Sequence, residues 1–95
     1  MFIIELTYKV PVEKIDEHLV AHVSFLDKYY ASGNFLASGR KVPRDGGVIL
    51  AKAPDKITVE SIISEDPFYI YSLADYRIIE FSTTKKIESL TALQD

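Results

Sequence analysis

The sequence lacks several residue types and motifs that mark whole classes of protein. It contains no cysteine, which excludes a disulfide scaffold, a zinc–thiolate site and a cysteine nucleophile. It has neither the Gly-x-Ser-x-Gly elbow of serine hydrolases nor a glycine pattern that binds phosphate. Because no cofactor motif is present either, we expect no bound cofactor.

Strong charge and long hydrophobic runs are also missing. The net charge is −3, and the longest basic run is Lys85-Lys86. A nucleic-acid partner needs a basic face, so none is expected. The segment "MFIIELTYKV" has no basic start and no long apolar stretch, which predicts neither a signal peptide nor a membrane span. We therefore expect a cytoplasmic protein with no membrane partner.

Apolar residues, in contrast, are plentiful for a chain of this length. The 95 residues are enough for a single domain, 1–95, near the lower end of sizes that fold alone. Yet 47% of them are hydrophobic, including six Tyr and five Phe. This surplus indicates that some apolar surface is covered by a partner subunit.

The first third of the chain contains a segment typical of a strand followed by a segment with helical spacing of apolar residues. Residues 2–10 are rich in β-branched and aromatic side chains and predict a strand that ends at Pro11. From Val12 to about Ser32 the apolar residues recur at helical spacing, and Gly33 is a natural stop. The residues of this helical stripe are Ile15, Leu19, His22, Leu26 and Tyr29.

The remaining two thirds predict a hairpin, a short helix and a last strand. Residues 34–43 and 48–53 have strand character, and "RDGG" between them is a turn. Asp55 can cap a short helix that carries apolar isoleucines. A final strand covers 73–81. The core then spans about 1–83, with a polar C-terminal tail at 84–95.

The predicted order is β-α-β-β-α-β, which is the ferredoxin-like α+β arrangement with a four-stranded antiparallel sheet and both helices on one face. Neighbouring apolar pairs, Phe2-Ile3 and Ile78-Ile79, place apolar side chains on both faces of that sheet. The chain has no second set of helices for the other face. We therefore expect a homodimer that packs sheet on sheet.

His22 is the first candidate for chemistry, because it lies in the middle of the helical stripe. A buried imidazole without a hydrogen-bond partner costs about 1–3 kcal/mol. It can be a core histidine that bonds a backbone carbonyl, or part of a functional site. His18 lies one turn earlier, but no third ligand is signalled nearby, so no metal site is predicted.

Two further segments allow a structural and a functional interpretation. Asp66 before Pro67 is a good opening for a helical turn, since aspartate caps and proline is favoured at the first position. Ser38-Gly39 interrupts a regular strand, and such a glycine often marks a bulge or a close approach to a ligand. Arg40 is either an anion contact or a solvated edge residue.

Together these segments resemble the YCII-related (YciI-like) domain family over roughly residues 1–83. The resemblance rests on the histidine in "AHVSFLDKYYASGNF", on "ASG" in the second strand, on the glycine-containing hairpin, and on "EDPF" before the last strand. It implies a dimeric α+β barrel of two ferredoxin-like protomers. It also implies a pocket in which His22 and Asp66 form the catalytic pair, with Ser38 and Gly39 lining it.

The resemblance leaves three classes of function open. The family is similar to small enzymes that act on ring-bearing, hydroxyquinone-type substrates by proton abstraction and elimination. We expect a cofactor-free enzyme of this kind, with Arg40, Phe68 and Tyr71 as further substrate contacts. The alternatives are a non-catalytic dimer that binds a small molecule, and a structural dimer with a buried His-Asp contact. Relatives often carry an arginine shortly before the histidine, but "EKIDEHLVAH" has none, so a relative's substrate is not inherited directly.

Overall fold

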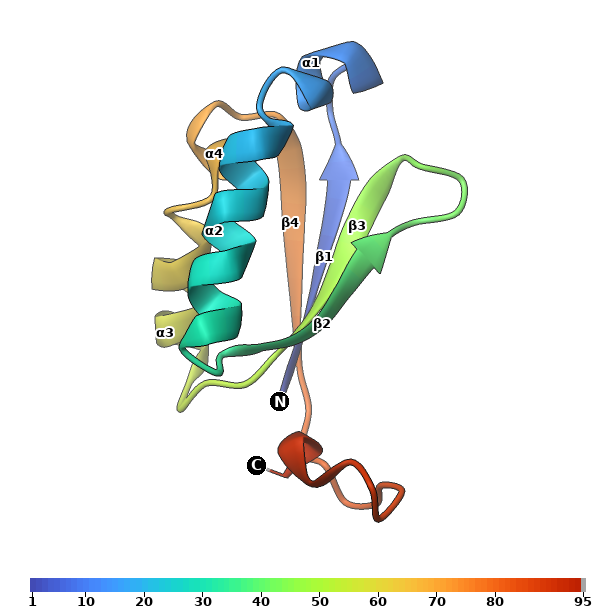
Figure 1. Cartoon of the computed structure of the whole chain (residues 1–95), viewed down its shortest axis with the longest axis vertical. Helices are drawn as coiled ribbons and strands as arrows, with labels where there is room; N and C mark the ends of the chain where they lie inside the picture. Colours follow the sequence, from blue (N-terminus) through green and yellow to red (C-terminus); the bar gives the residue numbers. More distant parts are fainter. Residues whose placement is uncertain (95) are drawn as a thin grey trace.

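A computed structural model describes residues 1–94 and shows one antiparallel sheet with helices on one face (Figure 1). The sheet order is β2-β3-β1-β4, which confirms the ferredoxin-like fold. The strands are β1 (Phe2–Tyr8), β2 (Phe35–Arg40), β3 (Gly46–Ala51) and β4 (Ala74–Glu80). The helices are α1 (Val12–Asp16), α2 (Leu19–Ala31), α3 (Lys56–Ile63) and α4 (Pro67–Ile70), followed by a 3-10 turn, η1 (Thr91–Leu93).

The first helical segment differs from the prediction of one helix over residues 12–32. It is divided into α1 and α2, and His18 at the junction has left the helical region with φ −113° and ψ 8°. The His18 N–H bonds the carbonyl of Ile15 instead of continuing the four-residue spacing. This tightened turn lets α1 cross the end of the sheet while α2 runs along it (Figure 1).

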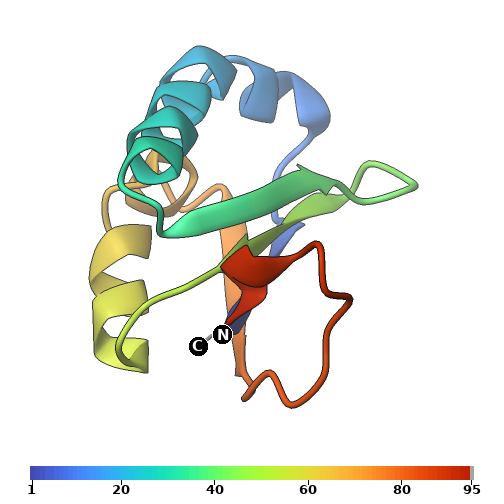
Figure 2. The same cartoon turned by 60° about the horizontal axis from the view of Figure 1, so that its bottom comes forward.

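The core lies between the sheet and the helices (Figure 2). Alternate residues of β1, namely Phe2, Ile4 and Leu6, point to the helices and are buried. Burial of each such side chain contributes about 1.5–3 kcal/mol. The helices cover these residues with Phe25 and Tyr29 of α2, Val59, Ile62 and Ile63 of α3, and Phe68 of α4. Phe25 was absent from the predicted stripe, although it precedes Tyr29 by four residues.

The opposite face of the sheet carries no helix in the described residues (Figures 1 and 2). Ile3 of β1 lies between Leu50 of β3 and Ile79 of β4 on this face. Val48 and Ile79 are 39% and 37% exposed. The sheet therefore presents an apolar strip, formed by Ile3, Val48, Leu50 and Ile79, which the helices do not cover.

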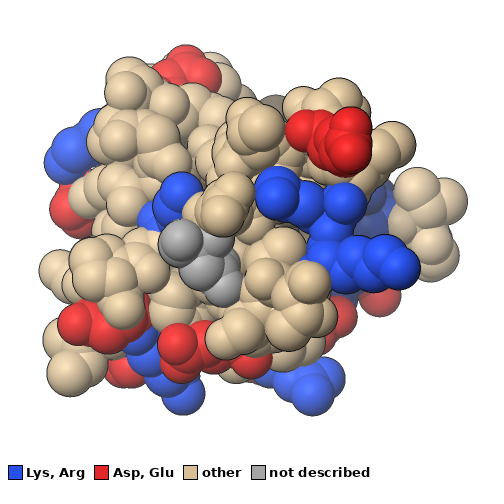
Figure 3. All heavy atoms as spheres, turned by 90° about the horizontal axis from the view of Figure 1, so that it is seen from below, with Lys and Arg blue, Asp and Glu red and all other residues tan. Residues whose placement is uncertain are grey.

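Charged side chains of both signs are interspersed on the end of the molecule that carries the tail (Figure 3). The tail predicted for residues 84–95 contains only the 3-10 turn among its described residues. Within residues 1–94, no helix is long and apolar enough to cross a membrane.

The glycines play other roles than the sequence predicted. Gly46 and Gly47 belong to β3 rather than to the turn, and Gly46 is buried. A methyl group on Gly46 would lie 1.8 Å from the carbonyl oxygen of Leu6 and 2.9 Å from its carbon. The bulge in β2 falls between Phe35 and Ala37, upstream of Gly39. A methyl group on Gly39 would meet nothing within 4 Å.

We predict that Gly46→Ala destabilises the protein by at least about 2 kcal/mol, because β1 and β3 must separate to admit the methyl group. Gly39→Ala is the matched control, and its free energy of unfolding should stay within about 1 kcal/mol of the wild-type value. Urea denaturation followed by circular dichroism measures both. Equal stability of the two variants would contradict the close approach at Gly46.

Candidate active site

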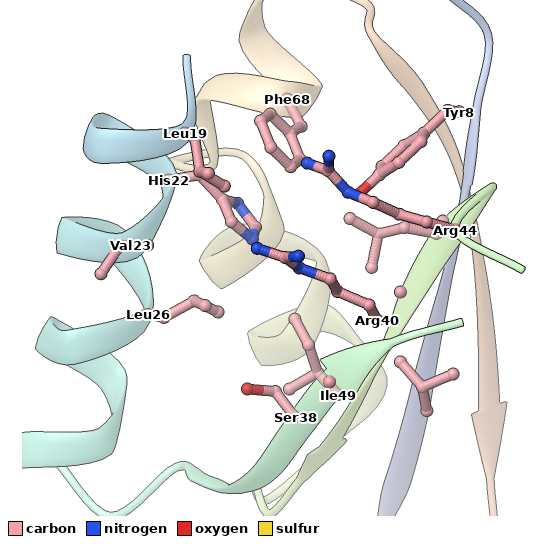
Figure 4. Close-up of a pocket in the computed structure, with 15 residues that line it drawn as sticks. Tyr8, Leu19, His22, Val23, Leu26, Ser38, Arg40, Arg44, Ile49 and Phe68 are labelled. Atoms are coloured by element: carbon pink, nitrogen blue, oxygen red, sulfur yellow. The ribbon is translucent and has the colours of Figure 1, made fainter. Parts of the chain in front are cut away.

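A cavity of about 190 Å³ opens between α2, α4 and the helix side of the sheet (Figure 4). Its walls are mainly apolar, with a few polar groups that converge on it, as is usual for small-molecule sites. The apolar walls include Leu19, Val23 and Leu26 of α2, Leu6 of β1, Ile49 of β3 and Phe68 of α4. The polar side chains are Tyr8, His22, Ser38, Arg40 and Arg44.

His22 and Asp66 meet at the back of this cavity. The imidazole extends from α2 into the cavity (Figure 4), and its Nδ1 lies 2.8 Å from Oδ1 of Asp66. The side chain of His22 is 12% exposed, whereas that of Asp66 is fully buried. The Phe68 ring is stacked flat on the imidazole, with centroids 3.9 Å apart and planes 6° from parallel. The stacking on Phe68 sets the plane of the His22 ring, and the bond to Asp66 sets the position of Nδ1.

Asp66 is a helix cap and the partner of His22 at the same time. It is the N-cap of α4, with Pro67 at the first helical position, and its Oδ1 accepts the Phe68 N–H at 3.0 Å. Its Oδ2 accepts the hydroxyl of Tyr76 at 2.5 Å. Burial, and then the charge of Asp66, raise the pKa of Tyr76 far above its usual value. The phenol therefore stays protonated and is the donor in this bond.

The hydrogen bond to Asp66 decides which nitrogen of the neutral His22 imidazole carries the proton. An ionised carboxylate only accepts, so His22 donates Nδ1–H to Asp66. In the neutral ring the proton is then on Nδ1, and Nε2 carries the lone pair. This arrangement gives the site one nitrogen that can accept a proton from a bound molecule.

The structure brings four of the other predicted site residues to the cavity. Ser38, Gly39, Arg40 and Phe68 all line it. The register of β2 points Ser38 and Arg40 toward the helices, because they pair with Ile49 and Gly47 of β3. The hydroxyl of Ser38 also lies 2.6 Å from that of Tyr30 on α2.

Tyr71 lies outside the cavity. The residue is 60% exposed, and its ring lies against that of His18 with centroids 4.5 Å apart and planes tilted by 31°. The residue follows α4, and the next residue, Ser72, has a φ of +54°. This turn directs the chain toward β4 and leaves Tyr71 on the surface.

Tyr8, Tyr76 and Arg44 were missed by the sequence prediction. Tyr76 carried a signal, since it lies opposite Leu6 and so faces the helices as a polar residue in an inward position of β4. Arg44 lies in the hairpin, where Nη2 donates to Oδ1 of Asp16 at 2.7 Å. Asp16, and to a smaller degree the Tyr8 hydroxyl, raise the pKa of Arg44. Its position depends on the shape of the loop, which no local pattern reveals.

Within residues 1–94, no three His, Asp or Glu side chains lie close enough together to hold a metal ion. His18, the other member of the His-xxx-His pair, lies against the Tyr71 ring, while His22 is bonded to Asp66. The two imidazoles thus have different partners.

Comparison with known proteins defines the class to which this fold and site belong. The family model of the YCII-related domain matches residues 1–82, and the chain belongs to this family. No curated protein matches the sequence. Among solved structures, the chain is similar to 5-chloro-2-hydroxyhydroquinone dehydrochlorinase (TftG) from Burkholderia phenoliruptrix AC1100, in complex with 2,5-dihydroxybenzoquinone. The TM-score is 0.72 at 16% identity, and the match covers 86% of this chain and 94% of that one.

We predict that Tyr76→Phe lowers the free energy of unfolding by about 1–3 kcal/mol, because a buried carboxylate oxygen loses its donor. Tyr69→Phe is the control: Tyr69 is half exposed, and its hydroxyl makes no hydrogen bond to the described residues. It should change stability by less than about 0.5 kcal/mol. Chemical denaturation of both variants checks the difference. Similar values for the two would show that the Tyr76 hydroxyl does not support Asp66.

Proposed function

We propose that this protein is a cofactor-free acid–base enzyme that acts on a small ring-bearing molecule. The observation that carries the proposal is the bond from His22 Nδ1 to the buried Asp66, which leaves Nε2 as the free nitrogen of an imidazole that lines the cavity. A histidine oriented in this way is a frequent general base or acid. In this proposal His22 is the catalytic residue and Asp66 is its positioning residue.

The proposed reaction is an elimination from the ring. Nε2 of His22 takes a proton from the substrate, and the electron pair of the broken bond forms a new double bond. A leaving group such as chloride departs with its own electron pair from a saturated ring carbon conjugated with that bond, which a chlorinated hydroxyhydroquinone offers in its keto tautomer. The substrate thus loses one proton and one anion, and no oxidant or reductant is needed. Asp66 stabilises the imidazolium that forms until its proton passes to solvent.

The substrate would lie between the sheet and the imidazole. Ser38, Gly39, Arg40 and Phe68 are the proposed contacts, since all four line the cavity. A cavity of about 150 Å³ holds benzene, so about 190 Å³ suits one substituted ring. The dehydrochlorinase with the same fold supports this choice of substrate size and reaction, which for the present chain is a proposal.

We predict that the purified protein releases chloride from 5-chloro-2-hydroxyhydroquinone or a related chlorinated hydroxyquinone. His22→Gln should lower the rate at least about a hundredfold, as expected when a general base is lost, while binding of 2,5-dihydroxybenzoquinone persists. Ion chromatography measures chloride, and titration calorimetry measures binding. Asp66→Asn should also slow turnover and should change the 15N NMR shifts of the His22 ring, which report its tautomer.

The outcomes separate the three classes of function. Undiminished turnover in His22→Gln would overturn the acid–base role. Ring binding by the wild-type protein, with no turnover of any substrate in the panel, would favour a binding module. Absence of both binding and turnover would favour a structural His22–Asp66 contact.

We also propose that two copies pack through the apolar strip of Ile3, Val48, Leu50 and Ile79. The strip crosses β3, β1 and β4 at Leu50, Ile3 and Ile79, with Val48 beside Glu5 at its edge, and no helix of residues 1–94 covers it. Burial of such a strip against a second copy is the arrangement expected for a dimeric α+β barrel. A twofold axis would place the same strip on both partners.

We predict that the wild-type chain sediments with twice the mass of one chain, and that Ile79→Lys shifts it toward the monomer, because a charge would be buried between the sheets. Val20→Lys is the matched control, since Val20 is an apolar residue on α2 that is 84% exposed. It should leave the mass unchanged. Sedimentation equilibrium measures the mass of each variant. A dimer that persists in Ile79→Lys would show that the two copies meet at another surface.

A further inference from the structure

The polar side of the cavity carries two arginines, of which only Arg44 is paired with a carboxylate. Two arginines, Arg40 and Arg44, line the cavity, and no aspartate or glutamate among the described residues does. Asp66 is fully buried behind His22, and both of its oxygens already accept hydrogen bonds. A molecule that enters the cavity therefore meets cationic groups on the sheet side and the imidazole on the helix side.

Arg40 is the arginine with an uncompensated charge. It follows Ser38 and Gly39 on β2 and extends into the cavity toward His22 (Figure 4). No ion pair or hydrogen bond joins its side chain to any residue in 1–94, although Lys41 beside it pairs with Glu5 at 3.2 Å. A guanidinium has five donors in a planar fork that fits two oxygen atoms. Arg40 is exposed to solvent, so its attraction for an anion weakens as salt is added.

Arg44 contributes a hydrogen-bond donor to the cavity rather than an unpaired charge. Its Nη2 is bonded to Asp16 at 2.7 Å, which neutralises the guanidinium. Its Nε is buried and makes no hydrogen bond of normal geometry to the described residues, although the Tyr8 hydroxyl lies close enough to the guanidinium to raise its pKa. Buried donors are nearly always satisfied in native proteins, so an unsatisfied one calls for an acceptor. Because Arg44 lines the same cavity, an oxygen of a bound molecule can supply that acceptor.

We propose that Arg40 and the Nε–H of Arg44 form an anion-binding subsite, which selects single-ring molecules that carry one oxyanion substituent. That substituent is either an ionised ring hydroxyl or a carboxylate, since both offer a charged oxygen to a guanidinium. One uncompensated cation matches one negative charge, and the cavity volume limits the ligand to one ring. This inference rests on the proposed function, because it names the substrate class of the same site.

Equilibrium binding of two matched pairs of probes tests the subsite without turnover. The first pair is 2-hydroxy-1,4-benzoquinone, whose single hydroxyl is ionised at neutral pH, and its neutral methyl ether, 2-methoxy-1,4-benzoquinone. The second pair is benzoate and neutral benzamide. Titration calorimetry on the full chain should show that at least one anion binds at least tenfold more tightly than its neutral counterpart. Which pair shows the difference identifies the oxyanion, and binding of the anion should weaken as salt is added.

Three variants assign the effect to residues. Arg40→Gln should weaken anion binding at least tenfold and abolish the preference over the neutral probe. Lys56→Gln removes one positive charge from α3, which contributes no residue to the cavity, and should bind like the wild type. His22→Gln should keep the anion preference, because it removes the proposed base and leaves both arginines.

Two results would overturn the subsite. One is a wild-type protein that binds neither anion at millimolar concentration or binds neutral and anionic probes equally. The other is an Arg40→Gln variant that retains the preference. Failure of the elimination chemistry is a separate result: unchanged turnover in His22→Gln contradicts the acid–base role, whatever the probes show.

Discussion

The buried carboxylate of Asp66 is the group on which the rest of the site depends. An unpaired charge in a protein interior costs several kcal/mol, yet Asp66 has no exposed surface. Three donors surround it: the Phe68 N–H of α4, the Tyr76 hydroxyl of β4 and the Nδ1–H of His22 on α2. Because each donor belongs to a different element, the requirement to satisfy one carboxylate fixes two helices and a strand relative to one another.

The same requirement orients the imidazole for chemistry. Asp66 engages Nδ1 and Phe68 covers one face of the ring. A tilt of the ring would break the stacking, and a flip of the ring would break the bond to Asp66. A histidine that served only to satisfy a buried aspartate would be equally stable in a filled core. Here its ring instead lines a cavity with two arginines on the opposite side. In the proposed function, the contact that stabilises the fold also prepares a nitrogen for proton transfer.

The features that the sequence predicted correctly are those that local patterns encode. The strand and helix periodicities give the order of the elements, and the resemblance identifies the family. The break at His18 was missed because Ile15 and Leu19 continue the apolar spacing across it. Tyr71 was predicted as a substrate contact, whereas the turn at Ser72 directs it away from the cavity. Tyr76 and Arg44 reach the site through strand pairing and loop shape, which involve residues far apart in the chain.

The charges around His22 affect which substrates the proposed base would accept. When His22 takes up a proton, the imidazolium adds a second positive charge to the cavity that the unpaired Arg40 lines, and the two like charges repel each other. Asp66 offsets this repulsion from one side of the ring. An anion held by the arginines would offset it from the other side. A neutral ligand would leave Arg40 uncompensated, so proton transfer to His22 is most favourable when the substrate itself carries the negative charge.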